Sequence, residues 1–282
     1  MLVLVRPGRR RCDGSEAAAE AEESAAARRQ DPERRTQVSG TTLGIIGTGM
    51  VGVAVARRAA DAGVCVVLSN SRGPETLAEL VAEIGPRARA ATPAEAAAAG
   101  DLVLAAVPLA ARERLPRAAL AGKTVIDPMN YALYPGFSLP QLDGNELTSS
   151  ELVQSHLADS RVVKALHSIG PKQLLELFRP AGADDRTAIP LSGDDETAKK
   201  EVADLLDVLG FDTVDLGTLA ESWRSEPNTP LYALPYVGQP PAGLSPEEFV
   251  AWVQRAAGIP ASAARIRDLA AAAVRGPAGF RM

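Results

Sequence analysis

The sequence predicts an α/β fold: a doubly wound parallel sheet, followed by a smaller C-terminal α/β domain and extra C-terminal helices. Three observations predict it. From residue 43 onward, short apolar runs alternate with longer helical patterns, which is typical of βαβ units. The glycine pattern Gly47-Thr48-Gly49-Met50-Val51-Gly52 separates the first apolar run from the first helical pattern. Residues 101–107 are apolar almost throughout, as expected of a strand covered on both faces.

The expected elements alternate in chain order. Strands are predicted at residues 43–46, 64–68, 88–91, 101–107, 124–126 and 161–166. Helices are predicted at 50–62, 75–84, 93–99 and 150–158, with a crossover through 112–121. About six strands match a complete Rossmann-type domain, which we place at residues 41–170.

The two ends of the chain differ from this domain. Residues 1–40 mix arginines with acids and hold few branched apolar residues, so we expect a disordered extension. Residues 171–282 predict a small domain with helices at 171–178 and 196–209 and strands at 187–191 and 211–214. The capping box Ser245-Pro246-Glu247-Glu248 opens an amphipathic helix that closes at Gly258, and a second tail helix is expected over 261–274. The apolar stripes of these two helices favour a role in packing, or as an arm that contacts the partner in a dimer.

Composition narrows the classes of function. The chain has 282 residues, a net charge of −5 and scattered basic residues, which makes nucleic acid an unexpected partner. Two cysteines and two histidines, without the spacing of metal ligands, predict a metal-free protein in a reducing compartment. We find no apolar run of membrane-helix length and no signal-peptide pattern, so we expect a cytoplasmic protein with no membrane contact.

The glycine pattern predicts a dinucleotide site. Gly47 permits a tight turn, Gly49 lets the backbone approach a pyrophosphate, and Gly52 lets the helix pack closely on the strand. The free N–H groups of the helix that begins near Met50 would face the phosphates, with Thr48 and Val51 beside them.

The end of the second strand predicts which nucleotide binds. An NAD-binding chain places an acid there to bond the ribose hydroxyls, whereas this chain has Asn70, Ser71 and Arg72. A guanidinium and hydroxyls suit a 2′-phosphate, so NADP is the expected cofactor. The other interpretation is a polar turn with Arg72 in solvent.

Two further loops follow strands on the same edge. Val107 and Pro108 are candidates for contact with adenosine or nicotinamide, and Asn130 for a hydrogen bond to the carboxamide. Plain strand-end packing is an equal alternative for both loops. Asp127, which precedes a proline, is interpreted as a turn acceptor in preference to a base.

These residues resemble the NADPH-dependent reductases of the deazaflavin coenzyme F420, also called F420H2:NADP oxidoreductases. The resemblance spans about residues 42 to 233 and rests on residues 47–52, 70–77, 106–108, 149–152, 162–169, 190–195 and 217–222. It implies that Thr48, Ser71 and Arg72 hold NADP and that the segment around His167 and Ile169 lines the deazaflavin pocket. It further implies a homodimer and direct hydride transfer between NADP(H) and F420, in which the two cofactors carry the chemistry.

Alternatives to this function stay open. One is an NADPH-dependent reductase of a small imine or carbonyl substrate in a biosynthetic pathway, with His167, Tyr131 or Lys164 as proton donor. Another is a non-catalytic NADP-sensing protein. His167 also has a purely structural interpretation, as a hydrogen-bonded residue at a strand end.

Overall fold

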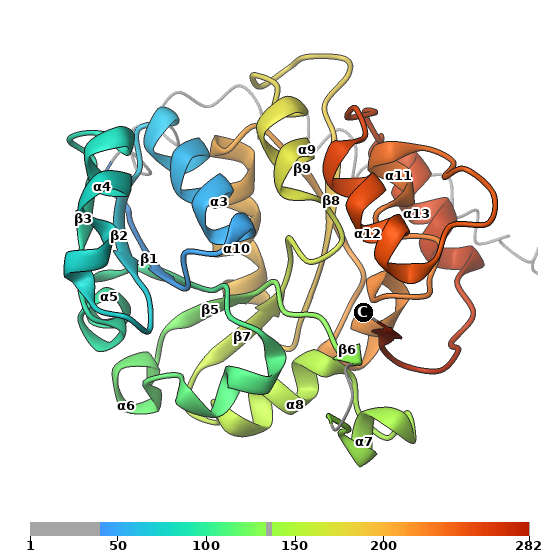
Figure 1. Cartoon of the computed structure of the whole chain (residues 1–282), viewed down its shortest axis with the longest axis horizontal. Helices are drawn as coiled ribbons and strands as arrows, with labels where there is room; N and C mark the ends of the chain where they lie inside the picture. Colours follow the sequence, from blue (N-terminus) through green and yellow to red (C-terminus); the bar gives the residue numbers. More distant parts are fainter. Residues whose placement is uncertain (1–39, 134–136, 282) are drawn as a thin grey trace, which may run out of the picture.

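The computed structural model describes residues 40–133 and 137–281 (Figure 1). The extension predicted over residues 1–40 therefore lies, apart from Gly40, outside the described residues. Within them, none of the helices is long and apolar enough to cross a membrane. No group of three or more His, Cys, Asp or Glu side chains gathers in this described part as a metal site would require.

One eight-stranded sheet forms the centre of the described structure. Its order is β3-β2-β1-β4-β5-β7-β8-β9, and all neighbours are parallel except β7 and β8. The strands are β1 (Thr42–Ile46), β2 (Cys65–Ser69), β3 (Ala88–Ala90), β4 (Leu102–Ala105), β5 (Thr124–Asp127), β7 (Arg161–Lys164), β8 (Ala188–Gly193) and β9 (Asp212–Asp215). This is the predicted Rossmann-type, doubly wound α/β fold, and its crossover from β3 to β4 over β1 places the switch point of the sheet at β1.

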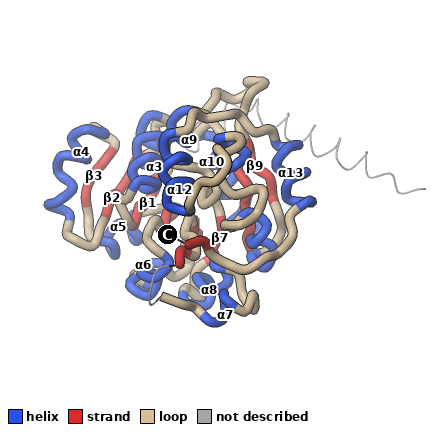
Figure 2. The backbone as a smooth tube through the Cα atoms, turned by 45° about the vertical axis from the view of Figure 1, so that its right-hand side comes forward, coloured by secondary structure: helices blue, strands red, loops and turns tan. Residues whose placement is uncertain are grey.

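Helices cover both faces of the sheet, which runs through the interior in Figure 2. The longer helices are α3 (Met50–Asp61), α4 (Ala78–Ile84), α5 (Pro93–Ala99), α8 (Ser149–His156), α9 (Pro171–Glu176), α10 (Glu196–Val208), α12 (Pro246–Arg255) and α13 (Ala263–Ala272). The shorter ones are η1 (Pro74–Leu77), η2 (Leu109–Arg114), α6 (Arg117–Leu120), α7 (Pro140–Asp143), η3 (Leu219–Ser225) and α11 (Leu234–Val237).

Strand periodicity explains the two-sided core. Ile45 and Leu104 belong to one buried cluster, with side chains from α3 and α10. Ile46 and Val103, one residue along their strands, belong to a second cluster with side chains from α8. Because successive side chains of a strand point to opposite faces, apolar strands of this kind require cover on both sides.

Three predicted segments differ in part from the structure. The helix expected over 75–84 begins instead as the 3₁₀ turn η1, because Gly73 adopts φ +106° and turns the chain just before it. The crossover over 112–121 is split into η2 and α6 by Pro116, which lies between them. The helix expected to close at Gly258 ends at Arg255, since the backbone is already extended at Ala256.

The C-terminal part joins the same sheet. β8 and β9 add two strands beyond β7, so residues 171–282 share a sheet with residues 41–170, and the division into two domains remains a prediction. At the end of the described chain, β10 (Phe280–Arg281) pairs in parallel with β6 (Ala132–Leu133), just after β5. Figure 1 shows α12 and α13, in red, on the β8 side of the molecule.

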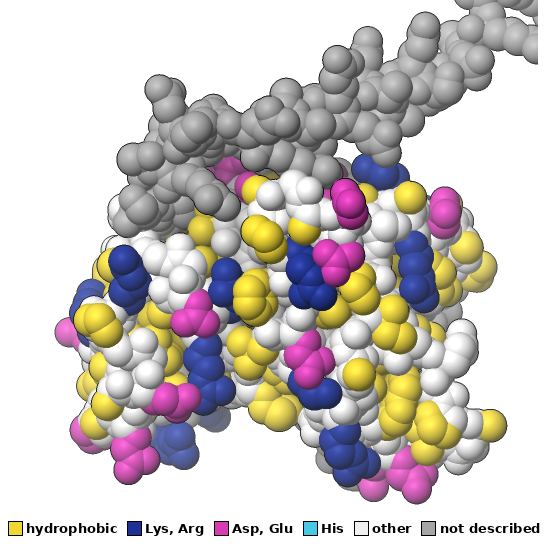
Figure 3. Space-filling model, turned by 90° about the horizontal axis from the view of Figure 1, so that it is seen from above, with side chains coloured by type: hydrophobic (Ala, Val, Ile, Leu, Met, Phe, Trp, Pro, Cys, Tyr) yellow, Lys and Arg dark blue, Asp and Glu magenta, His cyan; other side chains and the backbone are white. Residues whose placement is uncertain are grey.

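Charge is mixed on the surface that Figure 3 displays. Basic and acidic side chains are interspersed there among apolar ones, and neither sign dominates that face. This distribution agrees with the scattered charges of the sequence.

Candidate functional site

The glycine turn after β1 is a close-packed backbone junction. Gly47 has φ +105°, and a Cβ atom there would lie 2.1 Å from the carbonyl oxygen of Ala106. A Cβ atom at Gly52 would lie 2.0 Å from the carbonyl oxygen of Gly47. Both glycines are therefore required by the fold, one for its conformation and one for the contact of α3 with β1.

The N-terminus of α3 is open. A Cβ atom at Gly49 would meet nothing within 4 Å, and Met50 is 61% exposed. No side chain in the described part of the chain caps this helix, and its first turn holds no acid. The first N–H groups of an α-helix have no partner within the helix, so those near Met50, Val51 and Gly52 are available to an anion.

A pocket of about 540 Å³ lies at this helix end. It is lined by Thr48, Gly49 and Met50 from the turn and by Pro171 and Lys172 from α9. Arg57 of α3 also lines it. Arg57 is paired with Glu83 at 2.7 Å and Lys172 with Glu176 at 3.2 Å, so neither cation is a free phosphate ligand in this conformation.

The turn after β2 is held by Asn70. Its Oδ1 accepts hydrogen bonds from the backbone N–H groups of Arg72 (2.8 Å) and Gly73 (3.1 Å), and its Nδ2 donates to Thr76 Oγ1 at 2.9 Å. Asn70 thus shapes the turn, while Ser71 and Arg72 are exposed at its tip. The Arg72 guanidinium has no hydrogen bond or ion pair with any residue that the structure describes, and it is free to bind a phosphate.

The loops after β4 and β5 lie near the glycine turn. Val107 Cγ1 would be 3.2 Å from a Cβ atom at Gly47, so this side chain packs directly on the turn, while Pro108 is exposed. Asn130 Nδ2 donates to the carbonyl oxygen of His167 at 2.9 Å. Asn130 Oδ1 is buried without a partner among the described residues, so it can accept a hydrogen bond from a ligand amide.

His167 and Ile169 are interior residues. Their side chains are 4% and 3% exposed, and Ile169 belongs to the cluster that packs on one face of the sheet. His167 Nε2 lies 2.9 Å from Ser225 Oγ, which itself donates to the carbonyl oxygen of Ser222 at 3.1 Å. Nε2 must therefore carry the proton, and Nδ1 is left as a buried acceptor without a partner in the described part of the chain.

The imidazole of His167 is neutral at physiological pH. Burial lowers its pKa well below the ordinary value, and the charge of Lys164 lowers it further. A neutral ring without surface access matches the hydrogen-bonded structural interpretation, and it does not suit a proton donor. Contact of His167 or Ile169 with a deazaflavin remains a prediction.

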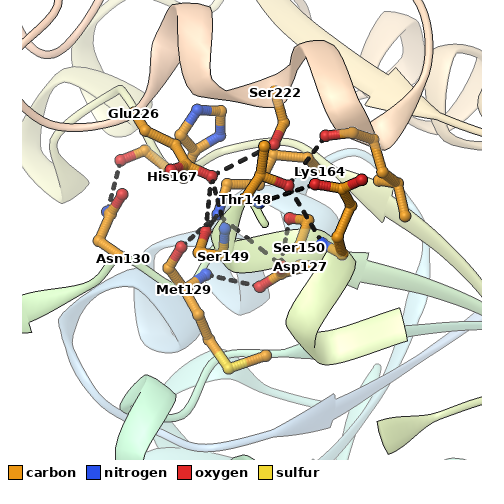
Figure 4. A network of polar contacts seen from close by, with 12 residues as sticks. Asp127, Met129, Asn130, Thr148, Ser149, Ser150, Lys164, His167, Ser222 and Glu226 are labelled. Carbon is orange, nitrogen blue, oxygen red and sulfur yellow. Dashed lines mark hydrogen bonds and ion pairs between the residues drawn. The ribbon is translucent and has the colours of Figure 1, made fainter. Parts of the chain in front are cut away.

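A buried polar network occupies the ends of β5 and β7 (Figure 4). Lys164 and Asp127 are both fully buried, with Lys164 Nζ 3.7 Å from Asp127 Oδ2. Lys164 Nζ also donates to the carbonyl oxygen of Met129 and to Ser149 Oγ, the latter at 2.8 Å. Ser149 in turn donates through Oγ to Glu226 Oε1 at 2.7 Å. This chain of contacts ties β5, β7 and α8 to the segment after η3.

Asp127 acts as the turn acceptor that its sequence context predicted. Its Oδ1 accepts from the backbone N–H of Met129 at 2.8 Å, and its Oδ2 accepts from Ser150 Oγ at 2.5 Å. Two of the proton donors considered for the alternative reaction are likewise engaged. Lys164 is enclosed by its partners, and Tyr131, 1% exposed, donates to Asp143 Oδ1 at 2.7 Å.

Residues 42–131 match the family described as "NADP oxidoreductase coenzyme F420-dependent". A solved structure of the hypothetical protein SMa0349 from Sinorhizobium meliloti is 32% identical, covers 69% of this chain and 94% of its own, and has a TM-score of 0.60. A protein from Arthrobacter sp. FB24, named provisionally as an F420-dependent NADP-reductase, is 28% identical over 65% of this chain and 87% of its own, with a TM-score of 0.55.

The chain belongs to the family of coenzyme F420-dependent NADP oxidoreductases. The Escherichia coli K12 protein YjhV is also similar, at 42% identity over 53 residues. That segment is 19% of this chain and 39% of YjhV, so the likeness concerns a part of each protein. As a family member, the chain is an NADP-type oxidoreductase, and its glycine turn and the open end of α3 lie within the matched residues.

The buried polar network is only partly predictable from the sequence. Lys164 was noted only as a proton donor, although a lysine that ends the apolar run Val162-Val163 signals a buried ion pair. Glu226 and Ser149 carry no comparable signal, because their contact joins residues 77 positions apart. The approach of α9 to the glycine turn was missed for the same reason.

Proposed function

We propose that this protein transfers a hydride between NADP(H) and the deazaflavin coenzyme F420. The observation that carries the nucleotide half is the acid-free N-terminus of α3, which no described side chain caps, together with the exposed guanidinium of Arg72, which no described residue pairs, at the end of the neighbouring strand β2. Membership of the family supports the deazaflavin half, together with the likeness to the Arthrobacter protein.

The residues fit NADP at three points. The free N–H groups near Met50, Val51 and Gly52 would bind the pyrophosphate, and Gly49 has no side chain to obstruct it. Arg72 and Ser71 would bind the 2′-phosphate, with Asn70 holding their turn in place. The unpartnered Oδ1 of Asn130 would accept from the carboxamide N–H₂ and so orient the nicotinamide.

The protein's part in such a reaction is positioning. When bound, the nicotinamide and the deazaflavin supply the donor and acceptor carbons between which a hydride moves. Asn130 is held by the carbonyl of His167, and the loop that carries Asn130 is held by Lys164 through the carbonyl of Met129. A buried, neutral His167 is compatible with direct hydride transfer, because the hydride comes from NADPH and the proton that the reduced deazaflavin also gains can come from solvent.

The decisive experiment mixes the full chain with NADPH and oxidised F420 and follows the deazaflavin absorbance. We expect loss of that absorbance with multiple turnovers. The Gly49→Ala variant tests whether the reaction uses the predicted site, because its Cβ atom meets no atom of the described residues within 4 Å and so leaves their packing intact. We expect this variant to raise the KM for NADPH about tenfold or more, since the methyl group lies where the phosphate must approach.

Other outcomes would replace the proposal. Stable deazaflavin absorbance with NADPH-dependent reduction of an imine or carbonyl compound would favour the small-substrate reductase. Tight NADPH binding without turnover on any of these substrates would favour an NADP sensor. Turnover that is unaffected by Gly49→Ala would remove the glycine turn from the site.

A further inference from the structure

A second, larger pocket lies in the C-terminal part of the molecule. Its volume is about 1090 Å³, and none of its lining residues falls within residues 42–131, the segment that the family match covers. It also contains none of the residues assigned above to NADP. Its walls are mostly apolar or aromatic, including Leu133, Tyr232, Leu234, Phe249, Val250 and Phe280.

Hydrogen bonds between distant segments hold this pocket in shape. Asn228 Nδ2 donates to the carbonyl oxygens of Gly279 and of Pro277, the latter at 3.1 Å. The backbone N–H of Phe280 donates to the carbonyl oxygen of Tyr131 at 3.1 Å, and its ring lies 6.0 Å from that of Tyr232. These hydrogen bonds hold residues 277–280 in place as one wall of the pocket, so the pocket is formed before any ligand binds.

The side chains that line the pocket are uncharged. No acidic or basic side chain is present among the described residues that line the pocket. Tyr232 supplies a hydroxyl that makes no hydrogen bond to the described residues. Burial raises the pKa of Tyr232 to about 12, so the phenol keeps its proton and can donate a hydrogen bond at physiological pH.

The pocket is joined to the proposed reaction site through two short segments. Leu133, on its wall, follows Asn130 by three residues in the loop after β5. Thr229, another lining residue, donates through Oγ1 to the carbonyl oxygen of Glu226 at 2.8 Å, and the Glu226 carboxylate belongs to the buried network. The pocket is thus coupled to the elements that position Asn130.

We infer that this pocket binds an uncharged, largely apolar small molecule that carries a hydrogen-bond acceptor for Tyr232. Concave, mostly apolar pockets of this size with a few polar groups are typical of small-molecule sites. An anionic group would lose its hydration there without gaining a cation. The inference goes beyond the proposed function, because it assigns a ligand class to a part of the chain outside the family match.

Nile red tests the inference, as a neutral, apolar dye with a carbonyl acceptor whose fluorescence rises in apolar surroundings. We expect saturable binding of one dye per full-length chain. Val250→Trp places an indole in the pocket and should weaken binding about tenfold or more. Gln254→Trp is the matched control, since Gln254 lies on the same helix, is exposed and does not line the pocket, and it should bind the dye as the wild type does.

Tyr232→Phe removes only the hydroxyl and should weaken binding about three- to tenfold, the effect of one lost hydrogen bond. Equal thermal unfolding midpoints for the variants would show that each keeps its fold. The inference is overturned if dye binding does not saturate, or if Val250→Trp and Gln254→Trp bind it equally. A protein that is inert toward F420 yet binds the dye in this Val250-dependent way would lose the proposed function and keep this inference.

Discussion

Two regions at the same edge of the sheet differ in how their polar groups are paired: the turns after β1 and β2, and the ends of β5 and β7. After β1 and β2, no side chain among the described residues caps the first N–H groups of α3 or pairs with the guanidinium of Arg72, and a Cβ atom at Gly49 would meet no described atom within 4 Å. At the ends of β5 and β7, Lys164, Asp127 and Ser149 satisfy one another in the interior. The first arrangement leaves hydrogen-bond donors available, whereas the donors and acceptors of the second are paired with one another.

This difference distinguishes groups that can bind a ligand from groups that hold the neighbouring backbone in position. Groups that are unpaired at a surface gain most from an incoming anion, because the protein has not already used them. Groups that are paired in the interior gain nothing from a ligand, but they fix the backbone beside it. Variants of the network should therefore change stability first, and variants of the open edge should change nucleotide affinity alone.

The largest expected effect comes from breaking the buried ion pair. Lys164→Met leaves the Asp127 carboxylate buried without its cation and the Met129 carbonyl without its donor. We expect the free energy of unfolding to fall by about 3–5 kcal/mol, measured by urea denaturation. The double variant Lys164→Met/Asp127→Asn should recover part of this loss, since it removes the unpaired charge. If Lys164→Met alone were as stable as the wild type, the Lys164–Asp127 pair would not stabilise the ends of β5 and β7.

A smaller effect is expected at the open edge. Arg72→Ala should weaken NADPH binding about tenfold, roughly 1.4 kcal/mol, and leave NADH binding almost unchanged, because only NADPH carries the 2′-phosphate. Arg89→Ala is the matched control, as it removes an exposed arginine from the neighbouring strand β3. Calorimetric titration measures all four affinities. Equal losses for both nucleotides would mean that Arg72 does not contact the phosphate.

The smallest effect is a dependence of stability on pH. His167 stays neutral in the folded protein because burial lowers its pKa well below 6.5, while the unfolded chain takes up a proton near that value. The neutral state therefore contributes stability that is fully present above about pH 6.5 and is lost as the pH falls. Between pH 7 and 5.5 we expect a loss of about 1 kcal/mol.

His167→Asn keeps a side chain able to donate to Ser225 and removes the titrating ring. Urea midpoints at the two pH values should fall less for this variant than for the wild type. His156, whose pKa burial also lowers, is present in both proteins and so cancels from the difference. The same fall in both would show that protonation of His167 does not oppose folding.

Much of the fold could be predicted because its signals are local. The alternation of apolar runs placed six strands within a few residues of their observed bounds, and the capping residue Ser245 marks a helix start that the structure shows. The glycine turn was likewise predictable, since Gly47 needs a positive φ and Gly52 has no room for a side chain. The helix predicted over 75–84 failed in part, because the chain turns at Gly73 with φ +106° and the first turn after it is a 3₁₀ turn.

The sequence by itself determined the doubly wound sheet and the glycine turn that leads into the acid-free first turn of α3, because both follow from periodicity and from residues close together in the chain. Only the tertiary structure decided that Lys164 and Glu226 share a buried network through Ser149, and that β8 and β9 extend one sheet. It also decided that the C-terminal segment walls a large uncharged pocket. These arrangements join residues dozens of positions apart, and contacts of that kind are set by packing and by the pairing of buried polar groups, which no local pattern encodes.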